Sequence, residues 1–180
     1  GTAGKINQDD INLKIIKESE LIFLEGYLWD EGDPKRAFDI SIENSRKVAM
    51  SLSDKFCVDR HKPHFLELVK NNLAIIFGNE DEIMSLIDTN DFNEVIQFGK
   101  SIKKILVITR GEKGSICVNK NTVQEFSAQK NLKIMDLTGA GDLFAAGFLH
   151  GFINGLDTEE SLKKGTELSS KIIQKIGARI

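Results

Sequence analysis

A glycine-rich turn near the end of the chain, Asp136-Leu-Thr-Gly-Ala-Gly-Asp142, has the residue types that phosphoryl transfer requires. Gly139 and Gly141 remove side chains where a backbone must turn tightly and approach a ligand closely. A helix expected to begin at Ala140 directs unpaired N–H groups and its positive dipole end outward, which makes an anion site. Asp142 lies in the first turn of that helix, where an ionised carboxylate is stabilised and can accept a proton from a hydroxyl. Backbone donors beside such a base suit transfer of a phosphoryl group to an alcohol.

Two other interpretations of this turn are open. In the first, Thr138 and Asp142 serve only to cap a helix behind a glycine turn. In the second, Gly139-Ala-Gly141 begins the fingerprint of a dinucleotide-dependent oxidoreductase, although Phe144 stands where that fingerprint needs its third glycine. The phosphoryl-transfer interpretation is preferred because it uses both the glycines and the carboxylate.

Two further groups of residues have spacings that suit a nucleotide and its metal. Thr109-x-Gly111-x-x-Gly114 would let a nucleotide lie against bare backbone, or would simply form a turn between strands. Asn79 and Glu82 are three residues apart at a predicted helix start, so they share a face and would orient a hydrated Mg²⁺ or a phosphate. Ordinary N-capping by Asn79 explains the same pattern.

A zinc site is not expected. Cys57, His61 and His64 have a spacing that suggests metal ligands, but no fourth ligand lies near them in the sequence. The other cysteine, Cys117, is far away, so a disulfide framework is not expected either, which fits a reducing compartment.

These residues need a scaffold that brings them to one edge, and the hydrophobic pattern predicts a parallel sheet. Short apolar runs predict buried strands, and amphipathic stretches between and after them predict helices. Continuous apolar strands separated by helices indicate a mostly parallel sheet covered by helices on both faces. The expected strands are Leu21–Leu24, Val48–Leu52, Leu73–Phe77 and Ile105–Thr109; the expected helices are Asp10–Glu18, Pro34–Arg46, Pro63–Lys70, Asp81–Ile87, Phe92–Ser101, Ala140–Ile153 and Thr158–Ile176.

The segment between the parallel strands and the glycine-rich turn has a different pattern. Ser115–Val118 and Val123–Phe126 predict two strands of a hairpin joined through Asn119–Asn121. A further short strand is expected around Leu132–Met135. Polar residues follow each predicted strand, and ligands of open parallel sheets bind at the carboxyl ends of the strands. We therefore predict the site at that edge of a single α/β domain over residues 1–180.

Composition excludes several classes of protein. The chain has 180 residues, 41% of them hydrophobic, which is enough for one globular core. The net charge is −3 and no basic stripe occurs, which argues against a nucleic-acid binder. The longest apolar segment, Leu143–Phe152, is shorter than the roughly 20 residues that span a bilayer. No secretion signal opens the sequence, so a cytoplasmic location without membrane attachment is expected.

Together the motifs resemble those of the PfkB (ribokinase) family of carbohydrate kinases. The turn Asp136–Asp142, followed by Leu-Phe-Ala-Ala-Gly-Phe, is similar to the C-terminal signature of that family. Thr109–Gly114 resembles its nucleotide loop, Asn79–Glu82 resembles its Asn-x-x-Glu motif, and the order of all three is the family's order. Glu25-Gly-Tyr27 and Gly177-Ala-Arg179 are most similar to bacterial adenosine kinase-like sugar or nucleoside kinases.

The resemblance implies a ribokinase-like fold and an ATP-dependent kinase. The expected reaction transfers the γ-phosphoryl group of ATP to a hydroxyl of a sugar or nucleoside of the ribose, fructose or adenosine class. By the resemblance, Asp142 is the catalytic base, and Gly139, Ala140 and Gly141 form the anion hole for the transferred group. A non-catalytic module of the same fold that only binds ATP is the main alternative.

The same resemblance assigns the remaining site residues and cofactors. Thr109, Gly111 and Gly114 would line the ATP site, while Asn79 and Glu82 would also contact the nucleotide and would hold Mg²⁺ through water. Some relatives bind K⁺ beside the glycine-rich turn, and Asp136 and Thr138 occupy the corresponding positions.

The resemblance covers the C-terminal part of the family's fold. The substrate-binding half and most of the lid are expected to lie outside this chain, with Gly1–Asn7 as the tail of a lid strand. Other members suggest a homodimer formed through that lid.

Overall fold

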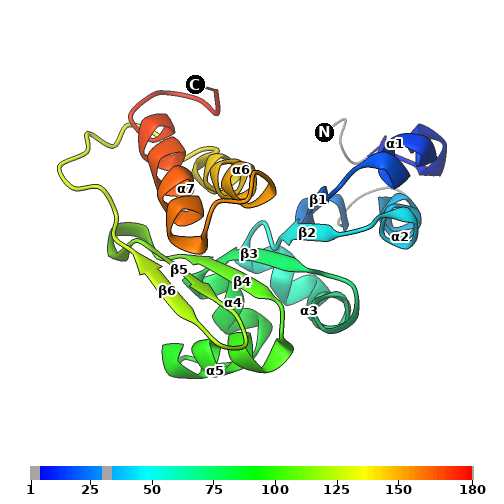
Figure 1. The fold of residues 1–180 in the computed structure, drawn as a ribbon, viewed down its shortest axis with the longest axis horizontal. Coiled ribbons are helices and arrows are strands. Elements are labelled where there is room, and N and C mark those ends of the chain that lie inside the picture. The colour runs from blue at the N-terminus through cyan, green and yellow to red at the C-terminus, as the bar shows by residue number, and fades with distance from the viewer. Residues whose placement is uncertain (1–4, 30–33, 180) are drawn as a thin grey trace.

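The computed structural model describes residues 5–29 and 34–179, and Figure 1 shows a sheet with helices packed on both faces. Within these ranges the strands are β1 (Ile22–Glu25), β2 (Val48–Ser51), β3 (Ile75–Asn79), β4 (Ile105–Thr109), β5 (Ser115–Val118) and β6 (Val123–Phe126). The helices are α1 (Leu13–Glu18), α2 (Pro34–Asn44), α3 (Lys55–Asn71), α4 (Glu80–Leu86), α5 (Phe92–Ile102), α6 (Ala140–Ile153) and α7 (Thr158–Ile172). Short 3₁₀ turns occupy Gln8–Asp10, Gly26–Trp29 and Gly111–Lys113.

The sheet is mixed, and its strands lie side by side in the order in which they occur in the chain. β1 to β4 are parallel, whereas β5 and β6 are antiparallel to their neighbours. The predicted mostly parallel sheet with a terminal hairpin is therefore confirmed. Its register places Glu25 opposite Ser51 and Asn79 opposite Thr109, so the four parallel strands end at one edge.

Both faces of the central strands are buried, which explains their uninterrupted apolar sequences. Met50, Ile76 and Leu106 point into the core beneath α3, α4 and α5, which cover one face. Neighbouring residues on the same strands, such as Ile75 and Val107, point into a second core beneath α6 and α7. Full burial of each such side chain contributes about 1.5–3 kcal/mol, so the two layers hold the strand ends firmly.

Helix α6 is fixed on the second face by aromatic packing. Phe144 and Phe148 are both buried, and the ring of Phe148 packs edge-on against Phe77 of β3 with 5.5 Å between centroids. α7 packs along α6 at glycine positions on both helices (Figure 1). This packing sets the N-terminal end of α6, where the glycine-rich turn lies, beside the carboxyl ends of the strands.

Two local predictions were wrong. Leu132–Met135 forms no strand; it is an irregular segment whose Met135 N–H donates to the Ile173 carbonyl oxygen at 2.8 Å, at the end of α7. Pro63 does not begin a helix but lies inside α3, which begins at Lys55 after the N-cap Asp54.

α3 continues through Pro63 because its buried face continues. Cys57 and Val58 before the proline and Phe65, Leu68 and Val69 after it all enter the core, which offsets the roughly 3 kcal/mol that an internal proline costs.

The expected lid strand is only partly described. Lys5–Asn7 contains no strand, and Gly1–Gly4 lie outside the described residues.

Candidate active site

The N-terminal turn of α6 presents free backbone donors. Gly139 has a left-handed φ of 78°, and the N–H of Ala140 is already used because it donates to the Leu137 carbonyl oxygen at 3.1 Å. The N–H groups of Gly141 and Asp142 donate no hydrogen bond to the described residues. A Cβ atom placed on Gly141 would meet no other atom within 4 Å. The turn is therefore an open cradle for an anion.

Asp142 lies in this turn and is near enough to Glu25, at the end of β1, for its charge to act on that carboxyl group; sequence reasoning did not include Glu25 among the site residues. The pKa of Glu25 is raised to about 7, first by burial and then by the negative charge of Asp142. Ser53 Oγ donates to Glu25 Oε2 at 3.2 Å, which favours the charged form in part. One signal for Glu25 was available, since it is a carboxylate directly after the first predicted strand.

The backbone that carries Glu25 packs tightly against the end of β2. A Cβ on Gly26 would lie 2.8 Å from the Leu52 carbonyl oxygen, so a larger residue does not fit. Ser53 has a φ of 75°, an uncommon value for a residue with a side chain, and its Oγ also accepts from the Tyr27 N–H at 3.2 Å. These contacts hold the Glu25 carboxylate at the edge of the sheet.

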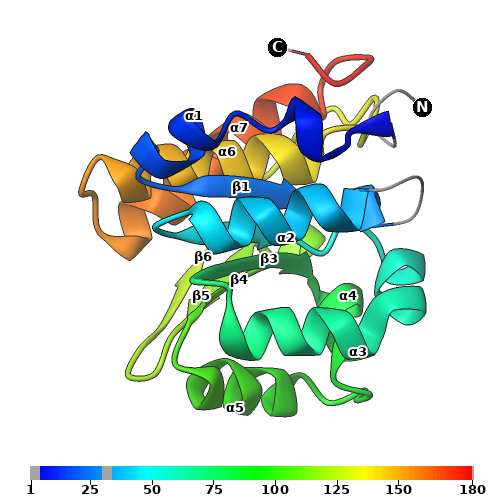
Figure 2. The same ribbon diagram turned by 90° about the vertical axis from the view of Figure 1, so that its right-hand side faces the viewer.

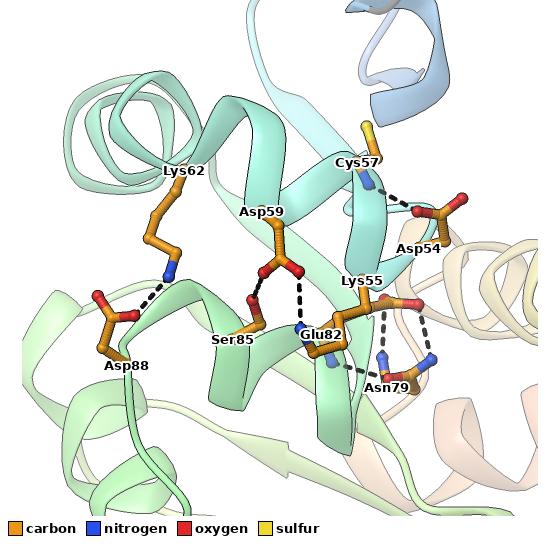
Figure 3. Close-up of polar contacts among 9 residues, drawn as sticks. All are labelled: Asp54, Lys55, Cys57, Asp59, Lys62, Asn79, Glu82, Ser85 and Asp88. Carbon is orange, nitrogen blue, oxygen red and sulfur yellow. Dashed lines mark hydrogen bonds and ion pairs between the residues drawn. The ribbon is translucent and has the colours of Figure 1, made fainter.

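Asn79 and Glu82 form a reciprocal cap at the start of α4, which Figure 3 shows beside the start of α3. The Glu82 N–H donates to Asn79 Oδ1 at 2.9 Å, while the Asn79 N–H and Nδ2 donate to Glu82 Oε2 and Oε1 at 2.9 and 2.7 Å. Burial raises the pKa of Glu82 to about 7, against the hydrogen bond from the Asn79 backbone, and Asp54 raises it further. The capping interpretation is correct. A role in Mg²⁺ binding stays a prediction, and it would use water because Asn79 already occupies both carboxylate oxygens.

α4 is held against α3 by further polar contacts. Asp59 of α3 accepts from Ser85 of α4, and Lys62 pairs with Asp88, two residues beyond the end of α4 (Figure 3). These contacts fix the direction of α4 and therefore the position of the Asn79–Glu82 pair at the strand ends.

The two glycines after β4, Gly111 and Gly114, have different surroundings in the structure. Gly114 has a φ of 95°, and a Cβ on it would lie 2.1 Å from the Phe126 carbonyl oxygen, so the hairpin itself requires glycine there. Gly111 has a φ of 55° with no atom within 4 Å of a placed Cβ, which leaves bare backbone facing open space. Thr109 ends β4 opposite Asn79. Of the two glycines, Gly111 is the one with room for a ligand.

Asp136 and Thr138 join the glycine-rich turn to the end of the chain. Asp136 Oδ1 accepts from the N–H and Oγ1 of Thr138 at 2.9 and 2.7 Å, and Oδ2 accepts from the Gly177 N–H at 2.9 Å. The hydrogen bonds from the Thr138 hydroxyl, the Thr138 N–H and the Gly177 N–H lower the pKa of Asp136 to about 2. The two residues thus have a structural role, and the K⁺ assignment stays a prediction.

Cys57, His61 and His64 lie on α3. Cys57 is buried, and the rings of His61 and His64 lie 6.4 and 5.8 Å from the ring of Trp29. In the described parts of the chain, no three His, Cys, Asp or Glu side chains gather as a metal site, and no helix is long and apolar enough to cross a membrane.

Comparison with known proteins agrees with this geometry. The model of the pfkB family carbohydrate kinases matches residues 2–180. The chain belongs to the PfkB family. This membership favours the phosphoryl-transfer interpretation of Gly139-Ala-Gly141 over the dinucleotide fingerprint.

Two solved kinase structures are similar to almost the whole chain. Adenosine kinase from Sinorhizobium meliloti is 34% identical with a TM-score of 0.95, and the match covers 98% of this chain and 56% of that one. A probable sugar kinase from Rhizobium etli is 34% identical with a TM-score of 0.92, over 98% of this chain and 55% of that one. The ribokinase-like α/β fold is therefore established for these residues.

A curated relative, an uncharacterized sugar kinase from Archaeoglobus fulgidus, is 27% identical over 186 aligned residues, 99% of this chain and 71% of the relative. The chain thus spans little more than half the length of the two solved kinases and less than three quarters of this relative.

Proposed function

We propose that the full-length protein is an ATP-dependent kinase that transfers the γ-phosphoryl group to a hydroxyl of a sugar or nucleoside. The observation that supports this most strongly is the N-terminal turn of α6. It combines the free N–H groups of Gly141 and Asp142 with the Asp142 carboxylate at the strand ends. Membership of the PfkB family supports the same reaction.

Each part of the turn has a chemical task in this proposal. The Asp142 carboxylate accepts the proton of the attacking hydroxyl, which makes its oxygen a better nucleophile. The N–H groups of Gly141 and Asp142 bind the oxygens of the phosphoryl group and stabilise their charge, while Gly139 and Ala140 form the turn that presents these donors. ATP would lie along Thr109 and the bare backbone at Gly111, near Gly114. Bound Mg²⁺ would supply charge neutralisation, held through water by Asn79 and Glu82. A K⁺ ion would lie at Asp136 and Thr138.

Two exposed aromatic side chains favour a nucleoside as the acceptor. Tyr27 and Phe56 are 52% and 73% exposed. Tyr27 hydrogen-bonds to Ser53, and Phe56 lies in the first turn of α3, two residues after the N-cap Asp54. Flat aromatic faces that follow the carboxyl ends of β1 and β2 suit stacking with a nucleobase. The name of the Sinorhizobium relative, adenosine kinase, agrees with this choice.

The test measures ADP release by the full-length protein with Mg²⁺–ATP and a panel of nucleosides and sugars. Asp142→Asn keeps the size of the side chain but removes the proton acceptor. We expect kcat to fall by about 1,000-fold with the preferred acceptor, while ATP binding measured by calorimetry stays within about twofold.

Glu160→Gln is the matched control, because Glu160 occupies the corresponding position in the first turn of α7 on the surface. We expect it to retain full activity. Tight ATP binding without turnover of any acceptor would instead support the non-catalytic module. Absence of ATP binding would contradict the proposed site itself.

A further inference from the structure

Glu80 connects α4 to the loop that follows β4. It is the first residue of α4, inside the capped Asn79–Glu82 motif, yet its carboxylate points to a different element. Arg110 Nε donates to Glu80 Oε2 at 2.9 Å, and Lys113 Nζ lies 3.3 Å from Glu80 Oε1. The side chains of Arg110 and Glu80 are only 17% and 21% exposed. A hydrogen bond from Arg110 is the largest cause that lowers the pKa of Glu80. Two cations of one loop therefore share one carboxylate.

The same arginine also contacts α5. The guanidinium carbon of Arg110 lies 3.9 Å from the ring centroid of Phe92, the first residue of that helix. This distance suits stacking of a planar cation on an aromatic face. The loop is closed by its own backbone, since the Arg110 N–H donates to the Gly114 carbonyl oxygen at 2.8 Å. Arg110 is thus clamped between α4 and α5, on the side of the sheet away from α6.

We propose that Glu80 is a positioning residue that fixes the Arg110–Gly114 loop for nucleotide binding. The inference rests on the proposed function, because it takes Gly111 as part of the ATP site. Within the described residues, the Glu80 carboxylate makes its hydrogen bonds and ion pairs with Arg110 and Lys113, and in this proposal it does not take part in proton transfer.

The physical reason is the conformational freedom of the loop. Gly111 and Gly114 both have positive φ values, and Gly111–Lys113 form only a single exposed 3₁₀ turn. Without the ion pair, this turn would sample other conformations, and nucleotide binding would carry the entropic cost of ordering it. Loss of the ion pair would therefore weaken nucleotide affinity, while the rate of the step that uses Asp142 would stay the same.

The test compares Glu80→Gln with the unaltered full-length kinase by steady-state kinetics and by calorimetric titration with ADP. We expect the KM for ATP and the Kd for ADP to rise about tenfold, since a charge-assisted hydrogen bond contributes about that factor, with kcat within about twofold. Glu80→Asp, which keeps the charge, should recover part of the affinity. Asp81→Asn is the matched control, because Asp81 is an exposed acid in the same helical turn.

A second pair of variants keeps the test decisive if Glu80→Gln folds poorly. Arg110→Gln removes the partner of Glu80. The double variant, with Glu80→Gln and Arg110→Gln, should bind ATP no worse than Arg110→Gln alone, because the two residues act as a unit. The inference would be overturned if the KM for ATP were unchanged in all variants. It would also be overturned if Glu80→Gln and Asp81→Asn lowered kcat and raised the KM for ATP to the same extent. If the unaltered protein neither binds nor uses ATP, the proposed function fails before Glu80 is tested.

Discussion

At the residue scale, the candidate site shows how the surroundings of a carboxyl group set its pKa. Burial raises the pKa of Glu25 and Glu82 to about 7, whereas three hydrogen bonds lower that of Asp136 to about 2. Asp136 stays ionised in its structural role, while Glu25 exchanges its proton near neutral pH beside Asp142.

The raised pKa of Glu25 predicts that the free energy of unfolding falls as the pH rises. Its folded-state pKa is above the ordinary value of 4.5, so the folded protein holds this proton more tightly than the unfolded chain. The resulting stabilisation is complete below about pH 4.5 and is lost as pH rises through about 7. Glu25→Gln does not ionise, so its free energy of unfolding relative to the unaltered protein should rise by about 1–2 kcal/mol between about pH 4 and 8. This change in free energy is smaller than the full pKa shift would give, because solvent screens a group that is not fully buried.

Urea denaturation of both full-length proteins at the two pH values measures this difference, and the Glu82 contribution cancels because it is common to both. Glu112→Gln, at an exposed acid of the Gly111–Lys113 turn, should show no such pH dependence. A difference between Glu25→Gln and the unaltered protein that stays constant over this pH range would show that the pKa of Glu25 is the same in the folded and unfolded states, contrary to the burial argument.

At the scale of elements, the hydrophobic pattern was sufficient for most of the fold. The parallel strands could be predicted because both faces are buried, which leaves an uninterrupted apolar run such as Ile105–Thr109. The Leu132–Met135 prediction failed because an apolar run without a neighbouring strand has no ladder to join. The Pro63 prediction failed because local rules place proline at helix starts, whereas tertiary packing extended α3 through it.

The candidate site was predictable where a motif required glycine and less so elsewhere. Gly139, Gly141 and Asp142 come together in one turn, so their spacing in the sequence is also their spacing in space. Glu25 lies more than one hundred residues away in the chain, and only the sheet and the packing of α6 bring it beside Asp142. No local rule gives that proximity.

Alanine substitutions at two glycines of α6 should distinguish a role in helix packing from a role in the reaction. A Cβ on Gly147 would lie 2.5 Å from the Lys164 carbonyl oxygen of α7, so Gly147→Ala must push the two helices apart. We expect it to lower the free energy of unfolding by about 1–3 kcal/mol. Gly141→Ala meets no atom within 4 Å, so it should fold normally. Its methyl group would enter the anion cradle and lower kcat/KM by about 100-fold.

Thermal unfolding and kinetics of both full-length variants check this pair. The interpretation of the cradle would be contradicted if Gly141→Ala retained normal kcat/KM. The packing interpretation would be contradicted if Gly147→Ala were as stable as the unaltered protein.

At the scale of the whole molecule, β1 is one of the two edge strands of the described sheet and pairs there only with β2. An unpaired edge of a parallel sheet is a template for association with another chain. The related kinases of known structure are nearly twice as long as the part that this chain matches. We therefore expect the 180-residue chain alone to self-associate more strongly than the full-length protein. Size-exclusion chromatography with light scattering over a range of concentrations measures this, and a monomer at all concentrations would contradict it.

The order of the strands also has a consequence during synthesis on the ribosome. Because β1 to β6 lie in the sheet in the order in which they leave the ribosome, each new strand finds its neighbour already made. Contacts then form mainly between segments close in the sequence. α6 emerges after the last strand and closes the second face, so Asp142 is placed only when the sheet beneath it exists. A nascent chain stalled before α6 would have every strand of the described sheet but would lack Asp142, the proposed proton acceptor.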